Sequence, residues 1–131
     1  MWKDQEYKEK RLKNLFKLKS HRQNLQEKLI DSIIQLRVPR EYIYSGTGEI
    51  FIGGKVPDWF NVNGKKKLIE YFGNYWHGEK RTGRTKEQEE KQRVDHFAKY
   101  GFTTLVIWES ELSNPEKISN KIKEFTNVLP N

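Results

Sequence analysis

The fold is decided by the stretch Pro57-Asp58-Trp59-Phe60-Asn61-Val62-Asn63-Gly64-Lys65-Lys66-Lys67-Leu68-Ile69-Glu70-Tyr71-Phe72-Gly73-Asn74-Tyr75-Trp76-His77. Asn63-Gly64 favours a tight turn between two short strand-like runs, so we expect a β-hairpin here. Asp58 opens the first predicted strand, Glu70 lies near the end of the second, and His77 follows the sheet. Two carboxylates on neighbouring strands and one imidazole suit a divalent metal ion and a general acid or base.

The charge of the chain is positive and unevenly distributed. The 131 residues carry a formal net charge of +7. Residues 1–40 hold eleven Lys and Arg against five Asp and Glu, so most of the surplus lies in this part of the chain. This asymmetry favours a polyanionic partner whose phosphates contact Lys and Arg. A solvated basic helix without a ligand is the alternative.

Several functional classes are excluded by composition. The chain has no cysteine, which excludes disulfides and cysteine-ligated zinc, and its histidines are His21, His77 and His96. No signal peptide is evident, and no apolar run approaches the roughly 18 residues needed to span a bilayer. We therefore expect a cytoplasmic protein without a membrane partner.

The N-terminal part of the chain predicts a basic arm and then a helix. Residues 1–20 are expected to form the arm, which we predict to be marginally helical. Ser20 and Gln23 fit a capping box that starts a helix at His21, and this helix is expected to end near Leu36. Its predicted apolar arc consists of Leu25, Leu29, Ile30, Ile33, Ile34 and Leu36. Glu27 falls at the edge of this arc, where it either reaches into a cleft or remains exposed.

The elements around the central stretch follow from periodicity. Residues 41–44 and 49–52 read as a second hairpin-like pair. A helix from about residue 85 to Tyr100 has its expected core positions at Val94, Phe97 and Ala98, with Glu87 and Glu90 sharing one side. Residues 103–108 are continuously apolar and predict a central strand that is covered on both faces. Asn114-Pro115 begins a last amphipathic helix with Ile118, Ile122, Phe125 and Val128 as expected core positions. This order of elements predicts a small mixed α/β domain.

Three motifs carry a resemblance to known nucleases. They are Pro57-Asp58, Ile69-Glu70-Tyr71-Phe72-Gly73-Asn74-Tyr75-Trp76-His77 and Gly101-Phe102-Thr103-Thr104-Leu105-Val106-Ile107-Trp108-Glu109. In this order and spacing they resemble very short patch repair endonucleases and the phage-type (EDxHD-type) homing endonucleases of the PD-(D/E)XK superfamily. The resemblance covers roughly residues 20–112. It implies a restriction-endonuclease-like core, here one nuclease domain over residues 21–131 with a central mixed β-sheet flanked by helices.

The resemblance assigns roles to individual residues. The metal-binding aspartate of the family matches Asp58, and the backbone carbonyl that helps to hold the metal matches Tyr71. The histidine after Gly-x-x-Trp matches His77, the implied general acid or base. The glutamate of the N-terminal helix matches Glu27. The acidic residue of the later helix matches Glu90, with Glu87 as the alternative.

The chain departs from the family in three ways. The superfamily motif Glu-x-Lys reads Glu70-Tyr71-Phe72, so the acid is kept and the lysine is lost. This leaves His77 as the expected proton-handling residue. Glu90 stands where the family more often has aspartate. The absence of cysteine removes the zinc ligands of the mismatch-repair members and argues against the repair role itself.

The expected function is a Mg²⁺-dependent DNA endonuclease. Asp58 and Glu70 would hold one or two Mg²⁺ ions, which Mn²⁺ can replace. The DNA backbone would contact a set of basic residues, namely Lys65, Lys66, Lys80, Arg81 and Arg84. Target recognition would come from a further domain or a homodimer. A DNA-binding module without catalysis and a protein-interaction domain with an incidental acidic pocket are the alternatives, and each candidate carboxylate or imidazole can instead have a purely structural role.

Overall fold

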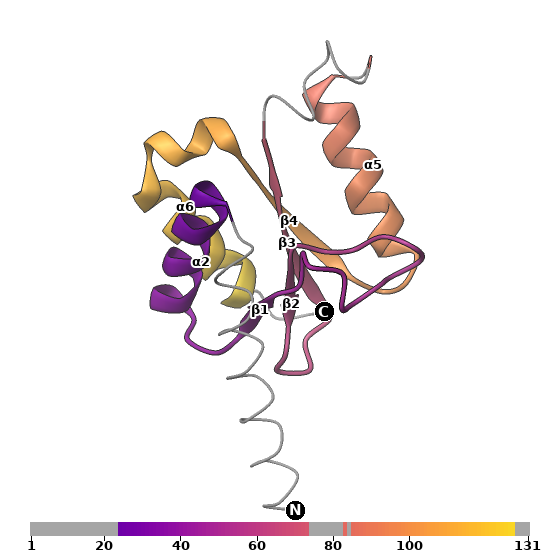
Figure 1. Ribbon diagram of the computed structural model, residues 1–131, viewed down its shortest axis with the longest axis horizontal. Helices are drawn as coiled ribbons and strands as arrows, with labels where there is room; N and C mark the ends of the chain where they lie inside the picture. Colours follow the sequence, from indigo (N-terminus) through magenta and orange to yellow (C-terminus); the bar gives the residue numbers. More distant parts are fainter. Residues whose placement is uncertain (1–23, 74–82, 84, 128–131) are drawn as a thin grey trace, which may run out of the picture.

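A computed structural model describes residues 24–73, 83 and 85–127 of the chain. Its elements are α2 (Leu25–Arg37), β1 (Tyr42–Tyr44), β2 (Trp59–Asn61), β3 (Lys67–Phe72), α5 (Lys86–Ala98), β4 (Thr103–Trp108), the 3₁₀ helix η1 (Glu109–Ser113) and α6 (Pro115–Asn127). The strands form one sheet in the order β1-β2-β3-β4, in which only the β3–β4 pair is parallel. Helices α2 and α6 lie on one side of the sheet and α5 on the other (Figure 1). The predicted mixed α/β class is confirmed, and the predicted arm lies outside the described residues.

The β2–β3 hairpin forms where the sequence predicts it. Trp59 pairs with Ile69 in an antiparallel register. Gly64 adopts φ 84°, a left-handed conformation that glycine accepts without strain. The Asn61 side chain stabilises the turn by accepting the backbone N–H groups of Asn63 at 2.9 Å and Lys65 at 3.1 Å.

Strand β3 distributes its side chains between the two layers of helices. Ile69 packs with Ile30, Ile34, Ile118 and Ile122 in the core under α2 and α6. Leu68 packs with Phe97 of α5 on the opposite face. Because side chains of a strand alternate between faces, Glu70 lies on the α5 side. The packing of Leu68 and Ile69 therefore places the Glu70 carboxylate between the sheet and α5.

Helix α2 differs from its prediction at its start and on its apolar face. It begins at Leu25 and not at His21, because Asn24 and Glu27 form a reciprocal capping box. Ile30 and Ile34 are fully buried, as expected, and Ile33 packs against the core. The arc was predicted too broadly, since its three leucines are exposed: Leu25, Leu29 and Leu36.

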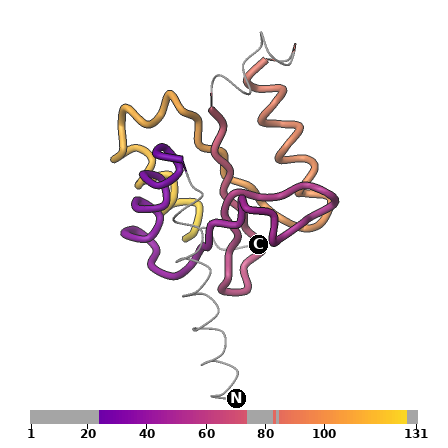
Figure 2. The backbone as a smooth tube through the Cα atoms, viewed as in Figure 1, coloured from indigo at the N-terminus to yellow at the C-terminus, as the bar shows by residue number. Residues whose placement is uncertain are grey.

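The second predicted hairpin is wrong. Strand β1 pairs with β2, as Ile43 opposite Phe60 shows, and residues 49–52 form no strand with it. Ser45 stabilises the pairing of β1 with β2, since its Oγ donates to the Pro57 carbonyl at 2.7 Å. The intervening loop extends to the end of α5, where a ring nitrogen of His96 lies 3.0 Å from the Ile52 carbonyl oxygen (Figure 2).

The remaining elements match their predicted ranges closely. The Thr85–Gln88 capping box starts α5, and Phe97 is buried, but Ala98 is exposed. Strand β4 is covered on both faces, yet among the described strands it pairs only with β3, so its predicted central place in the sheet is wrong. A continuous apolar run indicates that both faces of a strand are buried, but it does not indicate how many strands pair with it.

The C-terminal helix confirms its predicted apolar face. Ile118 and Ile122 of α6 are fully buried and Phe125 packs against the core, whereas Val128 lies outside the described residues. In the part of the chain that the structure describes, no helix is both long enough and apolar enough to cross a membrane.

Two truncations on α2 test the observed core boundary. Ile34→Ala should lower the free energy of unfolding by about 2–5 kcal/mol, because Ile34 is 0% exposed and its removal leaves a cavity. Leu36→Ala should change it by no more than about 0.5 kcal/mol, because Leu36 is 84% exposed. Urea denaturation of both variants measures the difference. Equal losses would contradict the observed face of α2.

Candidate active site

Asp58 is fixed by two backbone contacts within the hairpin. Its own N–H donates to Glu70 Oε2 at 3.0 Å. Its Oδ2 accepts the backbone N–H of Tyr71 at 2.8 Å. The structure therefore brings Asp58, Glu70 and the Tyr71 backbone together at the predicted site.

The Asp58 carboxyl lies in an unfavourable electrostatic environment. Burial raises the pKa of Asp58 well above its ordinary value, and the charge and hydrogen bonding of the Glu70 carboxyl raise it further. The Tyr71 N–H acts in the opposite direction, while the charge of Glu27 adds to the increase. A cation near this pair would relieve the repulsion between the two carboxyl groups.

Glu70 is buried against a cation that the sequence did not identify. The Glu70 side chain is 1% exposed, and Arg93 of α5 forms an ion pair with its Oε1 through Nε. Arg93 Nη2 also donates to the Val56 carbonyl at 2.8 Å. The available signal was helical spacing, because Arg93 lies one turn before the predicted core residue Phe97.

Glu27 reaches the same end of the sheet from the α2 side. Its Oε1 accepts the Asn24 N–H at 3.2 Å, and its Oε2 accepts the Tyr44 hydroxyl at 2.8 Å. Burial and the neighbouring Glu27 raise the pKa of Tyr44 above its ordinary range. Burial and Glu109 raise the pKa of Tyr71 to about 12, and Glu27 contributes to this increase. Carboxylates from different elements thus act on a common region.

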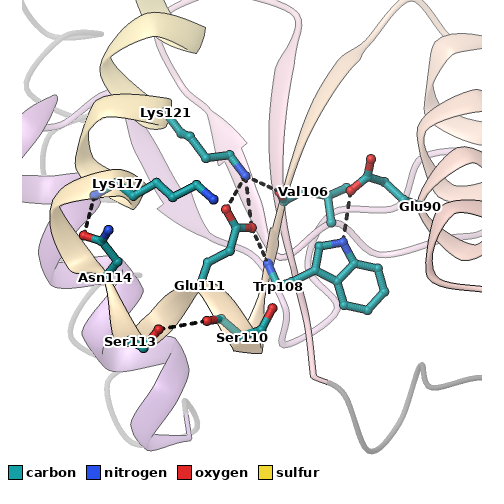
Figure 3. A network of polar contacts seen from close by, with 9 residues as sticks. All are labelled: Glu90, Val106, Trp108, Ser110, Glu111, Ser113, Asn114, Lys117 and Lys121. Atoms are coloured by element: carbon teal, nitrogen blue, oxygen red, sulfur yellow. Dashed lines mark hydrogen bonds and ion pairs between the residues drawn. The ribbon is translucent and has the colours of Figure 1, made fainter.

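Glu90 occupies a neighbouring cleft. Its Oε1 accepts the Trp108 indole N–H at 3.0 Å, and the Lys86 Nζ lies 4.8 Å from the centre of the Trp108 ring. The cleft has a volume of about 560 Å³ and is also lined by Glu87. Figure 3 shows the indole nitrogen of Trp108 directed at the Glu90 carboxylate. Trp108 pairs with Phe72 in the sheet, two positions along β3 from Glu70, so Glu90 lies on the same face of the sheet as Glu70 and contacts the strand that neighbours it.

The cleft wall is held by a half-buried ion pair. Glu111 accepts a hydrogen bond from the Trp108 backbone N–H at 3.0 Å and forms an ion pair with Lys121 at 2.7 Å (Figure 3). Burial alone would raise the pKa of Glu111, but the hydrogen bonds from Lys121 and the Trp108 backbone outweigh it and lower the pKa. This network fixes the end of β4.

Lys65 and Lys66 of the turn lie apart from the Asp58 and Glu70 carboxylates. Lys65 forms an ion pair with Glu41 at 2.9 Å, and the Lys66 Nζ lies 5.5 Å from the centre of the Phe102 ring. At a rise of roughly 3.3 Å per residue, Lys66 lies roughly 13 Å along the strand from Glu70. The structure therefore does not bring these lysines to the Asp58–Glu70 pair.

The remaining predicted residues, His77, Lys80, Arg81 and Arg84, lie outside the described residues. Within the described ranges, no three His, Cys, Asp or Glu side chains are grouped to hold a metal ion. Mg²⁺ commonly takes only one or two protein carboxylates and completes its shell with water and phosphate. The oxygen donors of Asp58 and Glu70 fit that preference.

Comparisons with protein-family models, curated proteins and solved structures find no match for this chain. The interpretation of the site therefore depends on its own geometry and on the sequence motifs.

The Glu111 ion pair gives the chain an acid-sensitive contact. Because the pKa of Glu111 is lowered by folding, its contribution to stability is present above the ordinary value of 4.5 and is lost as the pH falls through the folded-state pKa. Glu111→Gln should therefore flatten the decrease in melting temperature between about pH 6 and pH 3. Thermal unfolding monitored by circular dichroism measures it.

The matched control is Glu124→Gln, which removes an exposed carboxylate from α6 outside its first turn. Its acid profile should follow that of the unmodified chain. Identical profiles for Glu111→Gln and the unmodified chain would refute a stabilising role of the ion pair.

Proposed function

We propose that this chain is a metal-dependent DNA endonuclease that hydrolyses phosphodiester bonds on a restriction-endonuclease-like core. The observation that carries the proposal is the meeting of the Asp58 and Glu70 carboxyl groups beside the Tyr71 backbone. A buried glutamate and a half-buried aspartate that repel each other are typical of functional sites. The motifs around both residues, and the positive charge of the chain, support a nucleic-acid substrate.

Asp58, Glu70 and the Tyr71 carbonyl are the proposed metal ligands. Bound Mg²⁺, or Mn²⁺ in its place, would polarise the scissile phosphate and lower the pKa of a water molecule. One divalent ion balances the two carboxylates of the pair in formal charge.

The chain's own side chains would orient groups and move protons. His77 is proposed to accept the proton of the attacking water or to donate one to the leaving oxygen. Glu27 is fixed by Asn24 and Tyr44 and would add negative charge near Asp58. Glu90, held by Trp108, is proposed to orient water or DNA at the edge of the site.

The proposed DNA contacts fall into two groups. Lys80, Arg81 and Arg84 follow His77 in the sequence and are proposed to grip backbone phosphates near the reaction. Lys65 and Lys66 lie at the far end of the hairpin and would contact a different part of the backbone. Such contacts position DNA without reading its sequence, so a further domain or a second copy would supply target recognition in the cytoplasm.

A DNA-binding module without catalysis is the second candidate. Both Glu70 oxygens already have a protein partner, Oε1 in Arg93 and Oε2 in the Asp58 N–H. Phe72, where the superfamily has lysine, is buried. These contacts favour a structural role for Glu70, and cleavage assays separate the two candidates.

Cleavage of plasmid DNA tests the proposal directly. The full chain should nick or linearise supercoiled DNA with Mg²⁺ or Mn²⁺ and not with EDTA. Asp58→Asn should abolish cleavage because it removes a charged ligand, and His77→Ala should reduce the rate about 10²–10⁴-fold because it removes the acid or base. Gel electrophoresis over time measures both.

The control for Asp58→Asn is Asp95→Asn, which removes an exposed carboxylate that pairs with Lys91 on α5. This variant should cleave like the unmodified chain. DNA binding without cleavage in any divalent metal would support the binding module and reject the endonuclease.

Metal binding should also be visible without DNA. Mg²⁺ at about 100 times its dissociation constant should stabilise the folded chain by about 2.7 kcal/mol, because the ion binds only the folded site. Asp58→Asn should lose this effect. Differential scanning fluorimetry across a Mg²⁺ series measures it, and an equal stabilisation of both proteins would place the bound ion elsewhere.

A further inference from the structure

Arg93 joins the buried Glu70 carboxylate to the protein surface. Its Nε pairs with Glu70, its Nη2 donates to the Val56 carbonyl at 2.8 Å, and its guanidinium carbon lies 5.0 Å from the centre of the Phe97 ring. A guanidinium carries five N–H donors, and the described residues supply hydrogen-bond acceptors for two of them. The Arg93 side chain is 25% exposed, against 1% for Glu70. Part of the cation therefore faces solvent beside the site.

The charge of the site requires a cation for an anionic ligand. Asp58 and Glu70 together repel a phosphodiester, and Glu27 adds to the negative field at Asp58. One divalent ion balances the pair in formal charge, so the ion and its two carboxylates together carry no net positive charge toward a phosphodiester. Arg93 adds the one positive charge that a phosphodiester monoanion needs. In the described part of the chain, it is the Lys or Arg side chain that contacts this pair.

The contacts also fix the direction of the guanidinium. Nε and Nη2 are occupied on the Glu70 and Val56 side, and the guanidinium lies over the Phe97 ring of α5. A guanidinium fixed in this way has lost most of its freedom before a ligand arrives, so less entropy is lost on binding. Planar N–H pairs match the geometry of phosphate oxygens.

We infer that Arg93 binds a backbone phosphate of the DNA, donating from the guanidinium to a non-bridging oxygen while Nε holds Glu70. This inference rests on the proposed function for the identity of the ligand. It makes Arg93 a substrate-binding residue of the same site. A purely structural Arg93 would stabilise Glu70 and would not contribute to DNA affinity.

The salt dependence of DNA binding tests the inference. Affinity of the full chain for a short duplex is measured over a salt series by fluorescence anisotropy, once with Ca²⁺ and once with EDTA. Arg93→Gln should weaken binding about tenfold and reduce the slope of log K against log salt by about one, because one phosphate contact is lost. Arg93→Lys should keep the slope, because the charge remains. Lys91→Gln removes an exposed charge from the same helix and should change neither quantity.

A second variant separates DNA binding from folding. Arg93→Gln alone leaves the buried Glu70 carboxylate without its ion-pair partner and is expected to lower the melting temperature. Glu70→Gln/Arg93→Gln removes both charges and should recover most of that loss. The double variant should retain the reduced salt slope if Arg93 contacts phosphate, and a slope equal to that of the unmodified chain would overturn the inference.

The inference and the proposed function fail in different ways. Cleavage by the unmodified chain, with unchanged affinity and slope in Arg93→Gln, would refute the Arg93 contact and leave the endonuclease intact. An unmodified chain that cleaves under no metal, but loses affinity and slope in Arg93→Gln, would refute the endonuclease and support the phosphate contact.

Discussion

Burial of the Glu70 carboxylate is the constraint on which the rest of the structure depends. A carboxylate in the interior is tolerated only when hydrogen bonds and an opposite charge compensate its lost hydration. Glu70 obtains these from the Asp58 N–H on one oxygen and from Arg93 on the other. The first contact links β2 to β3, and the second links the sheet to α5. One side chain thus ties together the hairpin and the helix that covers it.

This arrangement determines which groups can meet. With Arg93 directed at Glu70, the preceding turn of α5 brings Glu90 to Trp108 at the end of β4. The parallel pairing of β3 and β4 places Trp108 opposite Phe72, two positions along β3 from Glu70. On the other face, the capping box of α2 holds Glu27 against Tyr44. The acidic groups come from separate elements, but the sheet brings them to one end of the molecule.

The sequence predicted local features well and long-range partners poorly. The Asn63-Gly64 hairpin, the Thr85 cap of α5 and the apolar face of α6 depend on neighbouring residues, and all three are confirmed. The false hairpin at residues 49–52 and the misplaced β4 depend on strand pairing, which apolar patterns do not encode. Arg93 was missed because a helix pattern shows which side faces inward and not which charge lies there. The roles of Asp58, Glu70 and Tyr71 were inferred from motifs, and their proximity is what the structure adds.

The identity of residue 58 is difficult to explain by folding alone. An asparagine there would still accept the Tyr71 N–H through its side-chain oxygen, and its backbone would still donate to Glu70. It would also remove the negative charge that burial and the Glu70 carboxylate disfavour, which is the cause of the raised pKa of the aspartate. Arg93 pairs with Glu70, and the ion pairs among the described residues include no Lys or Arg at Asp58, so the pair is undercompensated in this part of the chain. Residues that break a folding rule in this way concentrate at functional sites. An aspartate kept in this position therefore points to a positively charged ligand that the fold alone does not require.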